Sequence, residues 1–194
     1  MLRLAVSIAL ALAVSAPAAP DVTTAFACSA DLGMGLKSKR KFCDIILSDQ
    51  LKDGVSMTIP AHRGATTLRF DLHNRYTIPR EGSTPEALFA RHTAVVAILD
   101  QTGKVLDRAA VSREVRTAVD IFDRIGGGVG PEGAIIIAPG RPEPVVLELP
   151  EAVSAISVVG VSLEAMSLAE QRTHTTPGRP VAIGSNFRIE YTPR

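Results

Sequence analysis

The segment TLRFDLH, residues 67–73, carries the clearest structural signal in this chain of 194 residues. Its apolar members are Leu68, Phe70 and Leu72, and a polar residue stands at each position between them. Because successive side chains of a β-strand point to opposite faces, this alternation predicts a strand that buries one face and exposes the other. Asp71 and His73 belong to the polar face, which we expect to be in contact with solvent.

The same alternation recurs along the rest of the chain. It marks three further strands, at residues 55–59, 145–149 and 187–191. Two longer runs, 93–99 and 156–163, are apolar on both faces, which is typical of strands that are covered from both sides. An Asp-Gln-Thr-Gly turn at 100–103 predicts a hairpin after the first of these runs.

Proline and glycine are spread between the apolar segments, and signals for helices are sparse. The sequence Thr84-Pro85-Glu86 has the form of a helix N-terminus and predicts one or two turns up to Arg91. Residues 115–125 fit both helical spacing and alternation, so their structure stays open. Together the patterns predict an all-β protein, an antiparallel two-sheet β-sandwich of Ig-like or jelly-roll-like type with one or two short helices.

The N-terminus has the three-part pattern of a secretory signal peptide. A positive charge at Arg3 is followed by an uncharged apolar run at 4–14, and then by small residues and prolines. The run is shorter than the roughly 20 residues that a membrane helix needs. We expect residues 1–18 to be a signal peptide, with residue 27 as the latest cut, and residues 19–194 to form a single β-sandwich domain exported to the periplasm or the extracellular space.

The two cysteines of the chain are Cys28 and Cys43. In an oxidising compartment such a pair predicts one structural disulfide, since a redox pair or half of a metal site would be more closely spaced. A cut after residue 27 would leave Cys28 at the N-terminus, as in lipoproteins. A polar, proline-containing stretch separates Cys28 from the apolar run, so we do not expect a lipid anchor there.

The charge balance argues against nucleic-acid binding, because the net charge is +1 and the charged residues are scattered. After removal of the signal peptide, no segment is apolar enough to be transmembrane. One basic cluster, KSKRK at residues 37–41, interrupts this even distribution. We interpret it first as a solvated turn between strands and second as a contact to an anionic surface.

Two motifs could carry chemistry. The segment GGGVGPEG at residues 126–133 could cradle a phosphate, but no Gly-Lys-Ser/Thr follows it and the next residues look like a strand. We therefore interpret it as a flexible loop and expect no cofactor. Asp71 and His73 could share a metal or a proton, but a metal site needs three or four protein ligands. We keep both as site candidates, with a solvated strand face as the alternative, and expect no metal.

The usual motifs of exported serine hydrolases, zinc proteases and EF-hands are missing. By elimination, the leading hypothesis is an exported non-catalytic domain with an interaction or structural role, whose partner is another envelope or extracellular protein. The first alternative is an exported hydrolase with a carboxylate/His site on the loops at one end of the sandwich. The second is a small-ligand or carbohydrate-binding module, which the absence of tryptophan disfavours.

Overall fold

The computed structural model describes residues 19–78, 90–115, 120–129, 135–139, 141–167 and 170–194. In these ranges the chain forms strands and one short 3-10 helix. In chain order the elements are β1 (Asp21–Thr23), β2 (Ala30–Met34), β3 (Lys41–Ile46), η1 (Leu51–Asp53), β4 (Val55–Thr58), β5 (Thr66–Asn74), β6 (Tyr76–Ile78), β7 (Ala90–Asp100), β8 (Val105–Val115), β9 (Ile121–Val129), β10 (Ile135–Pro139), β11 (Glu143–Leu149), β12 (Ala155–Met166), β13 (Gln171–His174) and β14 (Pro180–Tyr191).

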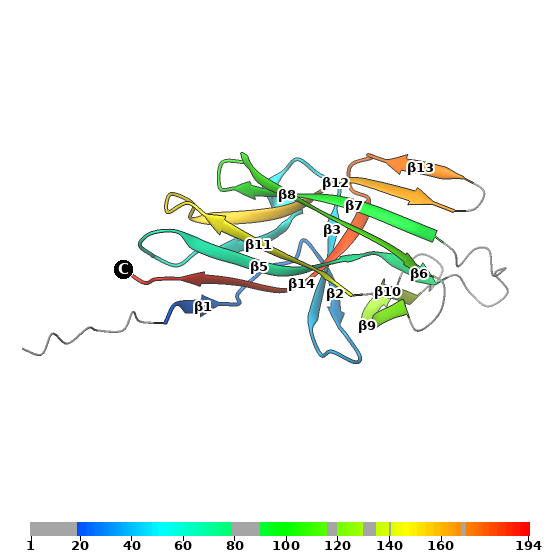
Figure 1. Cartoon of the computed structure of the whole chain (residues 1–194), viewed down its shortest axis with the longest axis horizontal. Coiled ribbons are helices and arrows are strands. Elements are labelled where there is room, and N and C mark those ends of the chain that lie inside the picture. The colour runs from blue at the N-terminus through cyan, green and yellow to red at the C-terminus, as the bar shows by residue number, and fades with distance from the viewer. Residues whose placement is uncertain (1–18, 79–89, 116–119, 130–134, 140, 168–169) are drawn as a thin grey trace, which may run out of the picture.

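Two antiparallel sheets form the layers of a β-sandwich, as the sequence predicts (Figure 1). The first sheet has the strand order β11-β5-β14-β3-β2, and β1 also pairs with β14. The second has the order β13-β12-β7-β8, and β4 also pairs with β12. The two runs that are apolar on both faces lie in β7 and β12, which are both interior strands of the second sheet.

The core lies between the inner faces of the two sheets. Strand β5 contributes Leu68, Phe70 and Leu72, all buried, as their alternation predicts. The ring of Phe70 stacks on that of Phe187 of β14, with centroids 4.9 Å apart. The second sheet closes the core with buried aliphatic side chains of β7 and β12, such as Val96 and Val158.

A small third sheet, of order β6-β10-β9, lies at one end of the first sheet. Strand β6 follows directly on β5, and β9 lies against β2 (Figure 1). Between this sheet and the outer face of the first sheet lies a second, smaller core of Leu32, Phe42, Ile125 and Ile183. The outer face of the first sheet is therefore covered at this end.

The structure corrects three local predictions. Ala90 and Arg91 belong to β7, so the helix predicted to reach Arg91 does not do so; Arg91 pairs across the sheet with strands on both sides, and residues 84–89 lie outside the described residues. Residues 121–125 are a strand, so the helical alternative is wrong there. Gly126 to Val129 continue that strand instead of forming a loop, and Val129 pairs with Ile135 of β10. Residues 130–134 lie outside the described residues.

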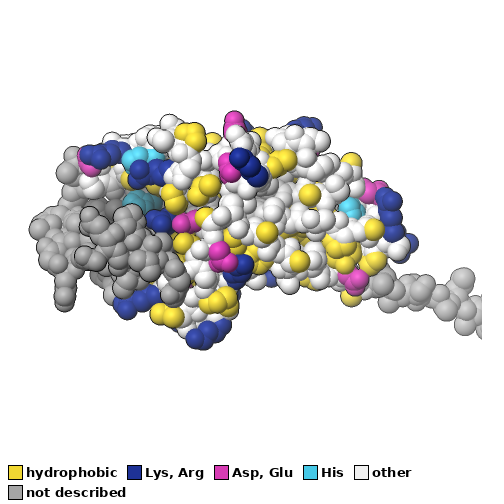
Figure 2. Space-filling model, turned by 180° about the vertical axis from the view of Figure 1, so that it is seen from behind, with side chains coloured by type: hydrophobic (Ala, Val, Ile, Leu, Met, Phe, Trp, Pro, Cys, Tyr) yellow, Lys and Arg dark blue, Asp and Glu magenta, His cyan; other side chains and the backbone are white. Residues whose placement is uncertain are grey.

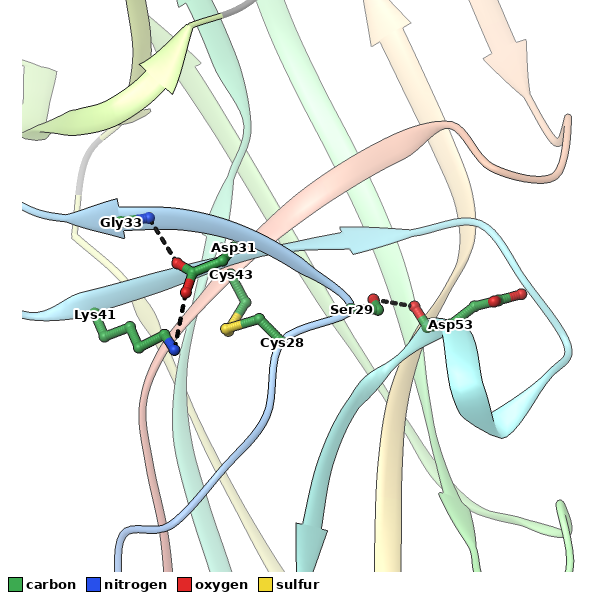
Figure 3. The surroundings of a disulfide bond; sticks show 7 residues. All are labelled: Cys28, Ser29, Asp31, Gly33, Lys41, Cys43 and Asp53. Carbon is green, nitrogen blue, oxygen red and sulfur yellow. Dashed lines mark hydrogen bonds and ion pairs between the residues drawn. A yellow bond between two sulfur atoms is a disulfide. The ribbon is translucent and has the colours of Figure 1, made fainter.

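Cys28 and Cys43 form a disulfide, with their Cα atoms 5.4 Å apart (Figure 3). The bond ties the segment before β2 to the buried face of β3. Next to it, Asp31 accepts hydrogen bonds from the backbone N–H of Gly33 and pairs with Lys41 at 2.9 Å. The sulfur of Cys28 is thus engaged in the bond to Cys43.

We expect Phe70→Ala to lower the free energy of unfolding by about 3–5 kcal/mol, because it leaves a cavity beside Phe187. The matched control is Val146→Ala on the neighbouring strand β11, whose side chain is 54% exposed on the outer face. We expect that control to change stability by less than about 0.5 kcal/mol. Urea unfolding of the two variants measures the difference, and equal midpoints would contradict the assignment of the faces.

We expect the double variant Cys28→Ala/Cys43→Ala to be about 3 kcal/mol less stable, because the disulfide closes a loop with a sequence separation of 15. Urea midpoints of oxidised wild type and variant give the difference. Thiol titration of unfolded wild type without reductant should find no free thiol. An unchanged midpoint in the variant would show that the bond contributes nothing to stability.

Candidate functional site

The two site candidates on β5 lie on the same strand face, but only one of them is near solvent. Asp71 is half-buried, whereas His73 is fully buried, so the prediction that His73 faces solvent is wrong. The alternation itself is correct, because His73 does point away from the main core. It is buried because the second core covers this end of the outer face, where the His73 ring contacts Phe42 and Phe122.

His73 forms a hydrogen bond with a serine, the pairing of a base and a nucleophile. Its Nε2 lies 3.0 Å from Oγ of Ser185 on β14. Burial, and then the positive charge of Arg40, lower the pKa of His73 to about 3, so the imidazole is neutral at pH 7. A serine beside a neutral histidine can act as an activated nucleophile where a substrate reaches it. Both side chains are fully buried here, so the pair serves to connect β5 and β14.

Asp71 is held in place by its neighbours on the same face. Arg40 pairs with its carboxylate at 2.6 Å, and the Asn186 side chain donates a hydrogen bond at 3.3 Å. Asp71 and His73 are not brought together as ligands of one ion. Among the described residues, no group of three or more His, Cys, Asp or Glu side chains could hold a metal.

Two other buried carboxylates, Asp44 and Asp123, also have partners within the protein: Asp44 is in an ion pair, and Asp123 accepts hydrogen bonds. Burial raises the pKa of Asp44, although Arg75 lies 2.8 Å away and acts in the opposite direction. Burial acts to raise the pKa of Asp123 as well, but hydrogen bonds from Ser38, Lys37 and Arg124 outweigh it and hold that pKa below its usual value. Asp44 thus holds Arg75 after the end of β5, and Asp123 holds the backbone of the turn at residues 37–38.

A concave surface lies on the outer face of the second sheet. This groove, of about 390 Å³, has a floor of Ala97 and Leu99 from β7 and Val159 from β12, all buried. Val105 and Val161 flank it and are 38% and 39% exposed. Its walls and rim are formed by Leu47, Ser48, Asp49, Gly103, Arg108, Gly160, Thr175 and Pro177.

One wall of the groove depends on a close approach of the two sheets. Beyond β3 the chain crosses to β12, where Leu47 bridges Gly160 and the Ser48 N–H donates to the Gly160 carbonyl at 3.2 Å. A Cβ atom on Gly160 would lie 2.6 Å from Val181 and 2.9 Å from the Ile46 carbonyl oxygen. Only glycine fits at this crossing without a shift of the backbone.

The chain after this crossing packs on part of the outer face of the second sheet. Leu51 of η1 packs on the cluster of Ala97, Leu99 and Val159, and its carbonyl accepts a hydrogen bond from Ser157 Oγ at 2.8 Å. The floor of the groove is thus the same apolar cluster that η1 packs against, and the groove lies beside η1. The runs that are apolar on both faces were the sequence signal for an apolar outer face. They did not reveal which segment packs on that face, because η1 comes from elsewhere in the chain.

The comparisons with known proteins found no match: no protein-family model, no curated protein and no solved structure matches this chain. The described residues include no helix that is long and apolar enough to span a membrane.

The burial of His73 predicts a loss of stability in mild acid. The unfolded chain binds a proton at His73 below a pH of about 6.5. The folded chain does not bind it until about pH 3. Between these values the unfolded state binds more protons, so stability falls as pH falls, by up to about 1.4 kcal/mol per pH unit from this residue.

We expect His73→Gln, which does not titrate, to reduce this slope, and His174→Gln on β13 to retain it. Burial also lowers the pKa of His92, so part of the slope should survive in His73→Gln. Urea unfolding at pH 6.5 and at pH 4.5 gives the slopes for the three proteins. The same slope for wild type and His73→Gln would rule out His73 as the source.

Proposed function

We propose that this chain is an exported, non-catalytic binding domain whose groove receives an apolar segment of another envelope or extracellular protein. The observation that carries the proposal is the groove on the outer face of the second sheet, with its buried apolar floor and its two exposed valines. An apolar surface of this kind, rimmed by polar residues, is typical of a protein interaction site.

Export is supported by the charged start, the apolar run and the small residues that follow it in the sequence. The Cys28–Cys43 disulfide is in keeping with an oxidising compartment.

The composition of the groove favours a protein segment over a sugar. Its described lining residues include no aromatic side chain on which a sugar ring could stack. Arg108 is the cation of the rim, and Asp49 lies elsewhere along it. We therefore expect the bound segment to place an apolar side chain on the floor and an acidic or carbonyl group beside Arg108.

The hydrolase alternative has one observation in its favour, the hydrogen bond between His73 and Ser185. The burial of both residues gives a substrate no access to them. The groove, in contrast, lies on the surface of the second sheet, where Val105 and Val161 are exposed to a partner.

The experiment places a charge in the groove without touching its buried floor. We expect Val105→Glu and Val161→Glu each to weaken binding of a partner from the native envelope at least tenfold, since each loses the burial of a valine and adds an unpaired charge. The partner is captured on the mature wild-type protein, and its dissociation constant is then measured with purified components.

The matched control is Val146→Glu, because Val146 is an exposed valine on the other sheet. This variant should bind like the wild type. A partner that binds all three variants equally would place the interaction outside the groove, and turnover of a small ester or peptide by the wild type would favour the hydrolase.

A further inference from the structure

The turn between β2 and β3 projects from the body of the sandwich (Figure 1). It contains most of the basic cluster that the sequence singles out, and the prediction of a turn between strands is confirmed. We call its exposed side chains the basic tip: Met34, Leu36, Lys37 and Lys39, with Arg124 of β9 beside them. In Figure 2 the lower end of the molecule shows apolar and basic side chains next to each other.

Two large apolar side chains of the basic tip are open to solvent. Leu36 is 58% exposed, which is more than any other large hydrophobic side chain that the structure describes. Met34 is 51% exposed, and among the described residues only Leu36, Val146 and Val22 exceed it. Isolated exposed apolar residues are common on protein surfaces. These two are separated by a single glycine, and cations flank them.

The cations of the basic tip are available for a ligand. Arg40 pairs with Asp71, and Lys41 pairs with Asp31. Within the part of the chain that the structure describes, Lys37, Lys39 and Arg124 form no ion pair. Three positive charges therefore surround the two apolar side chains without a counter-charge of their own.

The backbone of the tip is fixed by a buried carboxylate. Asp123 accepts hydrogen bonds from the backbone N–H groups of Lys37 at 2.9 Å and Ser38 at 2.8 Å. The Leu36 N–H donates to the Arg124 carbonyl at 2.9 Å, which ties the turn to β9. The negative charge of Asp123 is directed at the backbone, so the lysine ammonium groups remain exposed.

We propose that the basic tip binds the surface of an anionic lipid bilayer. Leu36 and Met34 would enter the interfacial region, and Lys37, Lys39 and Arg124 would contact lipid phosphates. A shallow cavity of about 260 Å³ beside the tip is lined by Leu36, Lys37, Ile121, Phe122, Asp123 and Arg124. Because the Asp123 carboxylate is among them, we assign the phosphate contacts to the exposed cations around the cavity and not to the cavity itself. Apolar side chains beside cations on one surface are the combination that peripheral membrane segments use.

The shape favours a bilayer over a protein or a nucleic acid. The tip is a projecting turn, which can enter a soft interface but offers little flat area to a protein partner. It has no exposed aromatic ring for base stacking, since Phe122 beside it packs on His73. The proposal is independent of the groove, which lies on the other sheet of the sandwich.

The test is flotation of the mature protein with vesicles of phosphatidylcholine alone and with vesicles that also contain phosphatidylglycerol. We expect binding only to the anionic vesicles, and weaker binding at high salt. Each cation near an anionic surface contributes about 1 kcal/mol, or about fivefold in the partition coefficient. Loss of two cations in Lys37→Gln/Lys39→Gln should therefore lower the partition coefficient about thirtyfold. Leu36→Ser should lower it while leaving the net charge unchanged.

The matched control is Lys52→Gln/Lys104→Gln, which removes the same charge from exposed positions in η1 and in the turn between β7 and β8, and this variant should bind like the wild type. Urea midpoints of all variants confirm that they fold. If both double variants lost vesicle binding equally, the binding would depend only on the net charge of the protein, and the proposal would be overturned. The proposal would also be overturned if the wild-type protein did not bind anionic vesicles, or if it bound a protein or a nucleic acid through this tip instead.

Discussion

The β-bulge in β14 is the local feature on which both cores depend. The pairing of β14 with β5 shifts between Ser185 and Arg188, and Asn186 takes a left-handed conformation with φ of 56°. Asparagine tolerates this region better than most residues, and a bulge changes which face the following side chains reach. Before the bulge, Ile183 and Ser185 point into the second core. After it, Phe187 points into the main core, between Phe26 and Phe70.

One strand thus serves two faces of its sheet with buried side chains. Phe187 has room for its ring because Gly184 has no side chain; a Cβ atom there would lie 2.5 Å from it. At the start of the bulge, Ser185 lies within hydrogen-bond distance of His73, and within the bulge the Asn186 amide lies within that of Asp71. The polar contacts of β5 and the aromatic stacking of the core therefore meet at one short segment of β14.

The sequence was sufficient to predict the strand class, the two-sheet sandwich and the disulfide. Alternation fixes which side of β5 carries Phe70, because that depends only on the strand itself. It could not predict that His73 is buried, because the cover of the outer face comes from Phe42 and Phe122, which are distant in the chain. The groove escaped prediction for the same reason, since η1 and the crossing at Gly160 shape it. Residues that are apolar on both faces indicate that something covers a strand, but they do not indicate what covers it.

The surroundings of Asp123 and His73 lead us to expect that the basic tip keeps its shape in mild acid. Gly35 lets the turn approach Asp123 closely, since a Cβ atom at this position would lie 2.2 Å from the Asp123 carboxylate and 2.7 Å from Phe42. The hydrogen bonds to Asp123 lower its pKa and preserve its charge as the pH falls, while burial keeps His73 neutral down to about pH 3. Both groups thus keep their neutral-pH charge states in mild acid. Acid weakens the fold through the protons that the unfolded chain binds at His73, and the contacts that shape the tip persist for as long as the protein stays folded.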